Sequence, residues 1–171
     1  MDFTIRPARA KEYEALGDLT AQAYLQDGHL DFGADDPYLD RLRDVASRAA
    51  KAEVLVAVDG HGPDGTAPPL GTVTFAVAGT PLAEIARPGE AEFRMLAVDP
   101  AARGRGVGEA LVRACLERAR AAGCTGITLS TQRSMHAAHR VYERLGFVRT
   151  PDRDWEPVPG LVSLITYELT W

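Results

Sequence analysis

The sequence has little of what nucleic-acid-binding or membrane-spanning proteins need. Its 171 residues carry 19 Lys and Arg against 24 Asp and Glu, so the net charge of -5 leaves no basic excess for binding a phosphate backbone. No apolar run is long enough to cross a bilayer, and the first residues do not have the pattern of a signal peptide. We therefore expect no nucleic-acid partner, no membrane segment and a cytoplasmic location.

Cysteine is equally scarce. Cys115 and Cys124 are the only two, without CxxC spacing or a His/Cys cluster around them. His136 and His139 lie three residues apart, but they lack the carboxylate and the spacing of an HExxH zinc site. We expect two reduced, structural thiols and no bound metal.

The length and composition favour one soluble domain. A chain of 171 residues with 46% hydrophobic and 25% charged residues can form one sizeable core, and it is short for two ordinary domains. The sequence contains no internal repeats and no low-complexity tract. We therefore treat residues 1–171 as a single domain.

The hydrophobic periodicity predicts an α/β (α+β) fold with the order βααβββαβαββ. Asp36 and Pro37 are typical of the start of the second helix, and Gly123 of the end of the third. Strands are expected at 3–7, 53–58, 72–77, 92–98, 127–131, 147–149 and 161–169, and helical spacing covers 13–24, 37–49, 107–119 and 138–145.

A glycine-rich turn, RGRGVG, stands between the strand at 92–98 and the following helix. It consists of Arg103, Gly104, Arg105, Gly106, Val107 and Gly108. The free amides and the positive dipole end of a helix start can bind a pyrophosphate, glycine leaves room for it, and arginine adds charge. No GKS or GKT follows, as a Walker A loop requires, and Glu109 stands where a dinucleotide fingerprint needs glycine. The alternative interpretation is a flexible turn with exposed arginines.

Three linked motifs resemble the GNAT superfamily of N-acetyltransferases. RGRGVG resembles its RxxGxG donor-binding signature, FRMLAVDP its central strand, and AAHRVYERLGF its AxxxYxxxGF helix. The resemblance is strong from about residue 90 to 147. It implies a GNAT-like central mixed, mostly antiparallel sheet with four helices, splayed open between the strands at 92–98 and 127–131. Acetyl-CoA would be the cosubstrate and would enter this opening.

The resemblance also implies residues for the donor. The backbone groups of Leu96, Ala97 and Val98 would pair with the pantetheine arm like an added strand. The amides from Arg103 to Gly108 would hold the pyrophosphate. Many relatives carry asparagine where Met135 stands, and a thioether cannot replace the hydrogen bond of that amide well.

Two catalytic residues follow from the same comparison. Tyr142 occupies the family's tyrosine position and would be the general acid toward the leaving sulfur, although a core tyrosine is the alternative. Glu92 lies where the histone-acetylating branch has its catalytic glutamate. Strand alternation would place Glu92, Arg94, Leu96 and Val98 on one face, so Arg94 is an alternative partner that neutralises Glu92. A water chain from Glu90 or Glu84 is a third possibility for the base.

The acceptor is less defined. Two acidic loops could hold a cationic amine through carboxylates and an aromatic face, or could be solvated surface. They contain Asp27, Asp31, Asp35 and Asp36 in the first and Asp154, Trp155 and Glu156 in the second. The expected function is transfer of an acetyl group to a primary amine of a small molecule or protein by direct attack on the thioester. A non-catalytic acyl-CoA-binding sensor module is the alternative, and a homodimer is allowed by either.

Overall fold

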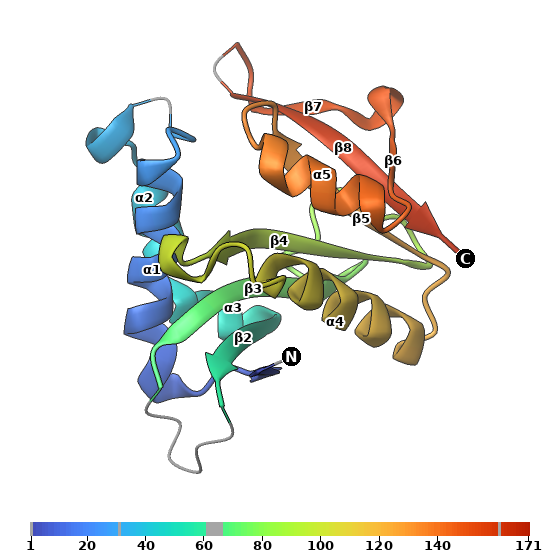
Figure 1. Cartoon of the computed structure of the whole chain (residues 1–171). Helices are drawn as coiled ribbons and strands as arrows, with labels where there is room; N and C mark the ends of the chain where they lie inside the picture. The colour runs from blue at the N-terminus through green and yellow to red at the C-terminus, as the bar shows by residue number, and fades with distance from the viewer. Residues whose placement is uncertain (1, 31, 61–66, 161) are drawn as a thin grey trace.

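The computed structural model describes residues 2–30, 32–60, 67–160 and 162–171. Within them, eight strands form one mixed sheet and five α-helices cover it (Figure 1). The strands are β1 (Phe3–Pro7), β2 (Glu53–Asp59), β3 (Pro69–Val77), β4 (Glu90–Val98), β5 (Gly126–Gln132), β6 (Val148–Arg149), β7 (Trp155–Val158) and β8 (Val162–Thr170). The helices are α1 (Tyr13–Gln26), α2 (Tyr38–Arg43), α3 (Val45–Lys51), α4 (Val107–Ala121) and α5 (His136–Arg144).

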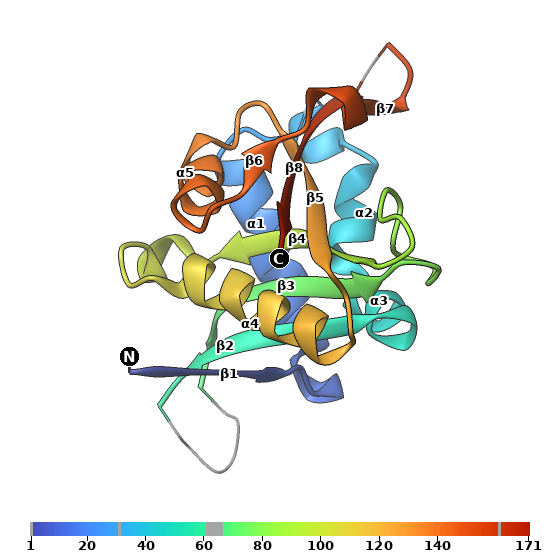
Figure 2. The same ribbon diagram turned by 90° about the vertical axis from the view of Figure 1, so that its right-hand side faces the viewer.

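The sheet has the order β1-β2-β3-β4-β5-β8-β6, and β7 pairs with β8. Among the described strands, β4 and β5 form the one parallel pair, and all other pairs are antiparallel. This confirms the expected mixed, mostly antiparallel sheet. Figure 2 shows β5 and β8 turned strongly relative to β2 and β3, so the sheet is highly twisted.

Helices pack on both faces of the sheet. Helix α1 packs on β3 and β4 and α3 on β2, whereas α4 packs on β2, β3 and β4 from the opposite face (Figure 1). The apolar stripe of α4 lies in the main core with Phe75 and Phe93. Gly123, with φ of 80°, ends this helix in the left-handed conformation, as its position in the sequence predicted. Both cysteines are buried free thiols.

The element order differs from the expected one in two places. The second predicted helix is two helices, because Asp44 has a non-helical backbone and its side chain accepts the N–H of Ser47 as the cap of α3. The start differs by one residue, since the helix begins at Tyr38 with Pro37 as its N-cap, and Asp36 Oδ1 accepts the N–H of Tyr38 at 2.9 Å. The other difference is β7, which is largely exposed and contains Pro157, so it has no buried alternation that the sequence could reveal.

A bulge in β4 overturns the expected alternation of this strand. Met95 has φ of 54°, and the register with β3 shifts by one residue between Arg94 and Ala97. Met95 packs on the helix side formed by α1 and α2, whereas Leu96 and Val98 pack against the α4 core. Glu92 and Arg94 therefore lie on the opposite face from Leu96 and Val98, and the prediction of one shared face is wrong.

The sheet opens between β4 and β5. Their pairing covers Glu90–Phe93 on β4 and Gly126–Leu129 on β5, although both strands continue further. After Leu129, β5 continues beside β8 and no longer pairs with β4. The β4 edge from the bulge to Val98 therefore has no neighbour on that side among the described residues. The expected opening is present, and the bulge lies at its start.

None of the helices in the described ranges combines the length and the apolar character needed to span a membrane.

Candidate donor and catalytic site

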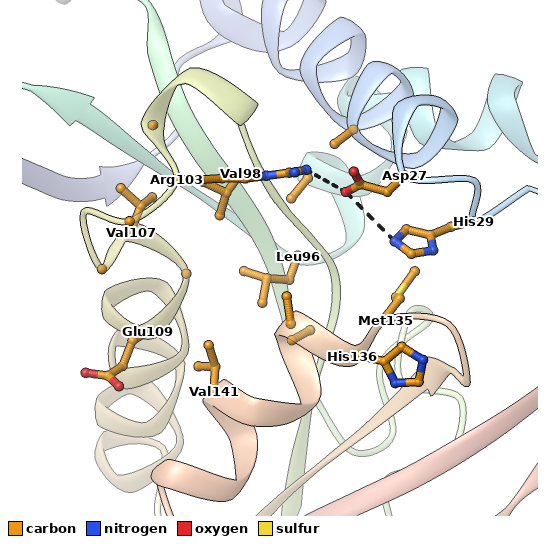
Figure 3. Close-up of a pocket in the computed structure, with 18 of the residues that line it drawn as sticks. Asp27, His29, Leu96, Val98, Arg103, Val107, Glu109, Met135, His136 and Val141 are labelled. Atoms are coloured by element: carbon orange, nitrogen blue, oxygen red, sulfur yellow. Dashed lines mark hydrogen bonds and ion pairs between the residues drawn. The ribbon is translucent and has the colours of Figure 1, made fainter.

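A cavity of about 720 Å³ lies where β4 and β5 separate (Figure 3). Its walls come from the end of β4, the glycine-rich turn before α4, the end of α1 and the start of α5. Eight of the nine predicted donor-binding residues line it. They are Leu96, Ala97, Val98, Arg103, Gly104, Gly106, Val107 and Gly108.

The turn leaves its amides free for a ligand. Gly104 and Gly106 have φ of 81° and 80°, which L side chains rarely adopt. Gly106 is the N-cap residue of α4, and the carbonyl of Gly106 accepts the N–H of Ala110 at 3.0 Å. The amides before Ala110 are therefore those without a helical partner. A Cβ on either glycine would meet no atom of the described chain within 4 Å, so the space above the turn is open. The arrangement fits an anion such as a pyrophosphate.

Arg105 departs from the expectation. Its guanidinium donates to Asp59 at 2.6 Å and to Asp2 at 2.8 Å, and it lies over the ring of Phe3 at 5.9 Å. The side chain thus holds the ends of β1 and β2 together and is not part of the cavity wall. The expected phosphate role of this side chain is not supported, and only its backbone remains in the turn.

Arg103 faces the cavity and is paired. Its Nη2 lies 2.5 Å from Asp27 Oδ2, at the end of α1 (Figure 3). Half of the Arg103 side chain is exposed, so the pair can exchange partners with an entering anion.

Tyr142 is part of the aromatic core beside the cavity. It is only 4% exposed and packs against Phe93, Phe147, His139 and Tyr167 at centroid distances of 5.7–6.4 Å. Burial raises the pKa of its hydroxyl, and nearby Cys115 and Tyr167 add to the effect. The hydroxyl makes no hydrogen bond within the described residues. It stays protonated at neutral pH and can donate a hydrogen bond.

Glu92 is buried and fully engaged on one oxygen. Its Oε1 accepts the backbone N–H groups of Glu84, Ile85 and Ala86 at 2.9–3.0 Å. Burial raises the pKa of this carboxyl despite these bonds and the nearby Arg94. Arg94 itself pairs with Glu84 at 2.8 Å. The carboxylate therefore fixes the segment 84–86.

Glu90, the other carboxylate on this strand, is held by Arg153. Arg153 Nη2 lies 2.9 Å from Glu90 Oε1, and Nη1 lies 3.0 Å from Oε2. Arg153 also donates to the carbonyl of Ile85 at 2.7 Å. Arg153 is thus a second support for the segment 84–90, and Glu90 has little freedom to relay protons.

The described residues of the two acidic loops have separate partners. Asp36 accepts the N–H of Tyr38 at the start of α2, Asp154 pairs with Arg149 at 2.9 Å, and Trp155 Nε1 donates to Ser130. Glu156 accepts the N–H of Gly160. Asp31 lies outside the described residues. Of the members of this set that the structure describes, Asp27 alone lines the cavity.

His29 is a cavity residue that no sequence pattern indicated. His29 lines the cavity, its Nδ1 lies 2.8 Å from Ser134 Oγ, and its Nε2 lies 3.9 Å from Asp27 Oδ2. Ser134 precedes α5, which starts at His136, and the Ser134 hydroxyl bonds to His29. This contact joins residues 105 positions apart, which no local pattern reveals.

His136 and His139 have separate environments on α5. His139 Nε2 lies 3.0 Å from the carbonyl of Gln132 and 3.2 Å from Thr131 Oγ1, so its ring is held in the core. His136 lines the cavity and is exposed.

Comparison with known proteins identifies one family for the part of the chain that contains the cavity. A model of the acetyltransferase (GNAT) family matches residues 15–147. The chain is 36% identical over 70 residues to N-acetylaspartate synthetase of Danio rerio, covering 41% of this chain and 25% of that protein. It is 41% identical over 61 residues to mycothiol acetyltransferase of Mycobacteroides abscessus, covering 36% and 21%. The match thus spans about a quarter of the length of these curated relatives.

Solved structures show the same fold. A GNAT family acetyltransferase from Staphylococcus aureus Mu50 aligns with a TM-score of 0.73 at 14% identity, over 98% of both chains. A GNAT family acetyltransferase from Brucella melitensis, solved in complex with acetyl-CoA, aligns with a TM-score of 0.58 at 26% identity, over 85% of this chain and 82% of that one.

Proposed function

The chain belongs to the GNAT acetyltransferase family, and we propose that it transfers an acetyl group from acetyl-CoA to a primary amine of a small molecule or a protein. The amine nitrogen attacks the thioester carbonyl directly. The observation that carries this proposal is the cavity, because it combines an unpaired strand edge, a glycine-rich helix start and an arginine in one space.

Each wall of the cavity would bind a different part of the donor. The free edge of β4 from Leu96 to Val98 offers backbone groups to the amides of a pantetheine arm. The amides of residues 104–108 and the guanidinium of Arg103 hold the pyrophosphate. The backbone, not the side chain, of Arg105 takes part. Met135 contributes an apolar side chain to the cavity wall. Its sulfur accepts a hydrogen bond from the hydroxyl of Thr131 at 3.4 Å.

Tyr142 assists the departure of the sulfur. A free tyrosine, with a pKa of about 10, is a weaker acid than a thiol at about 8.5, and burial raises the pKa of Tyr142 further. Full proton transfer is therefore uphill at first. We assign to the hydroxyl a hydrogen bond that stabilises the developing thiolate, followed by proton transfer as the sulfur leaves.

Glu92 supports the site from a distance. The resemblance offered it as the base, with an ion pair to Arg94 as the alternative, but the three N–H groups on its Oε1 engage it with the segment 84–86. We therefore propose Glu92 as a positioning residue for this segment, beside the strand where the sheet opens.

The test is release of CoA thiol from acetyl-CoA with a panel of amines. The panel contains amino acids including aspartate, polyamines, aminoglycosides, arylamines and peptides with free amines. Selective turnover of one class supports the enzyme and names its acceptor class. Tight CoA binding without thiol release across the panel would favour the alternative, a non-catalytic acyl-CoA sensor. Sedimentation of the same preparation tests the homodimer.

A further inference from the structure

We propose that His29 is the proton acceptor for the incoming amine, held in place by Ser134 and facing Asp27. The proposal rests on the acetyltransferase function proposed above and adds to it a catalytic residue outside the family motifs of this chain.

The position of His29 is fixed by contacts from three directions. Its backbone N–H donates to the carbonyl of Tyr24 at 3.0 Å, directly after α1. Its ring packs edge-on against the ring of Tyr24 with a centroid distance of 6.1 Å. Its Nδ1 lies 2.8 Å from Ser134 Oγ, in the connection between β5 and α5. The imidazole is therefore ordered before a substrate arrives.

This position is beside the point where the sheet opens. Tyr24 and Leu30, the neighbours of His29, pack in one apolar cluster with Met95 and Met135. Met95 is the bulge residue at which β4 leaves β5, and Leu96 next to it lines the same cavity as His29 (Figure 3). A thioester at the inner end of the donor site would lie next to this cluster.

The two ring nitrogens have different surroundings. We assign the Nδ1 proton to the hydrogen bond with Ser134 Oγ, which leaves the lone pair on Nε2. Nε2 lies 3.9 Å from Asp27 Oδ2, too far for a hydrogen bond but close enough to attract an imidazolium. The neutral ring can accept a proton, and Asp27 stabilises the charged product.

The charges around His29 suit a base that works near neutral pH. Burial lowers the pKa of the imidazole, Asp27 opposes this, and Arg103 and His136 add to the lowering. The pKa of His29 therefore lies below its ordinary value, and the ring is neutral at every pH above that pKa. Glu92 Oε1 is held by backbone amides and both oxygens of Glu90 by Arg153, and neither residue belongs to the described lining of the cavity.

The proton balance of the step is complete. The acceptor enters as an ammonium ion, and Nε2 of His29 takes one proton to leave a neutral amine. The nitrogen forms a bond to the thioester carbon, the carbon–sulfur bond breaks, and the sulfur leaves with the electron pair. The second proton of the nitrogen ends on the sulfur by way of the Tyr142 hydroxyl. His29 then releases its proton to solvent.

The experiment combines a pH profile with a titration. The value of kcat/KM for the most active amine of the panel is measured across pH at saturating acetyl-CoA. The ring of His29 is titrated by NMR in the CoA complex. We expect an acidic limb in kcat/KM whose midpoint agrees with the His29 titration, since activity needs the neutral ring.

Three variants test whether His29 is a general base or only a structural residue. His29→Gln should lower kcat by about 10²- to 10⁴-fold and remove the limb, with CoA affinity within about threefold of wild type. Asp27→Asn should move the limb to lower pH, because the carboxylate raises the pKa of His29. His136→Gln, which removes a second imidazole that lines the cavity, should keep the limb and move it slightly to higher pH, because His136 lowers the pKa of His29.

Two outcomes would overturn the proposal, and they are distinguishable from each other. If wild type turns over an amine and His29→Gln keeps both its rate and its limb, His29 is not the base, although the acetyltransferase function stands. If wild type binds CoA and turns over no amine, the proposed function fails and the assignment of His29 fails with it.

Discussion

Arg103 Nη2 lies 2.5 Å from Asp27 Oδ2 and thereby connects the donor-binding turn to the end of α1. The same Asp27 oxygen lies 3.9 Å from Nε2 of His29. A pyrophosphate that binds Arg103 competes with Asp27 for the guanidinium. Donor binding would then leave the Asp27 carboxylate available to the imidazole or to a cationic acceptor, which favours binding of the donor before the acceptor.

The Asp27–Arg103 pair predicts opposite effects of two substitutions on CoA binding. Asp27→Asn removes the competitor, and because a partly exposed pair contributes about 0–1 kcal/mol, CoA affinity should rise by up to about fivefold. Arg103→Gln should lower the affinity and weaken its dependence on salt. Isothermal titration calorimetry at two ionic strengths measures both. A lower affinity for Asp27→Asn would contradict the competition.

The glycine turn predicts a specific loss of donor binding in Gly106→Asp. The side chain places bulk and negative charge in the space above the helix start, so CoA binding should be abolished. Gly123→Asp is the matched control, since Gly123 also has φ of 80° and open space around its Cβ at the other end of α4. Both variants should lose about 1–2 kcal/mol of stability from the left-handed backbone. Equal CoA affinities would refute the anion site.

Removing the Tyr142 hydroxyl should slow turnover without affecting donor binding. Tyr142→Phe keeps the ring among Phe93, Phe147 and Tyr167, so the stability should change little, whereas kcat should fall by about 10²-fold. Tyr167→Phe, the same change in the neighbouring ring, should keep kcat. Steady-state kinetics of both variants decide between a proton donor and a core tyrosine.

The three amides on Glu92 predict that this residue matters more for stability than for proton transfer. Glu92→Ala leaves three partly buried N–H groups without an acceptor and should cost about 1–3 kcal/mol in urea unfolding. Glu92→Gln keeps an oxygen acceptor, so kcat should stay within about tenfold of wild type. A loss of about 10²-fold or more in kcat would instead return the role of base to Glu92.

The same carboxyl gives a pH dependence with a definite sign. Burial holds the pKa of Glu92 above the 4.5 of an ordinary glutamate, so the folded state prefers the protonated form. This contribution is present below about pH 4.5 and is lost as the pH rises through the pKa of the folded state. The stability of Glu92→Gln relative to wild type should therefore increase with pH across that range, as measured by urea unfolding at several pH values.

The donor half of the site could be predicted because its signals are local. The turn from Arg103 to Gly108 directly precedes α4, and its glycines and its helix start are adjacent in the sequence. The alternating strands and the apolar stripe of α4 are equally local patterns. The resemblance of these local motifs to the GNAT superfamily therefore implied the opening at which the β4 end and the turn line one cavity.

The acceptor half could not be predicted because it depends on long-range contacts and on one irregular residue. Met95 carries no local sign of the positive φ that reverses the alternation of β4. The contact of His29 with Ser134 joins the end of α1 to the approach of α5. The roles of Asp154 and Arg105 follow from Thr166 and Asp59, partners that only the folded chain brings close.

The most direct test of the account is mass spectrometry of the acceptor together with CoA thiol release, in wild type, Gly106→Asp and Gly123→Asp. The account predicts that wild type and Gly123→Asp add one acetyl group to the amine for each thiol released, and that Gly106→Asp releases none. If wild type and Gly106→Asp acetylate the amine equally, or if wild type binds CoA and leaves every amine unmodified, acetyl transfer does not occur in this cavity.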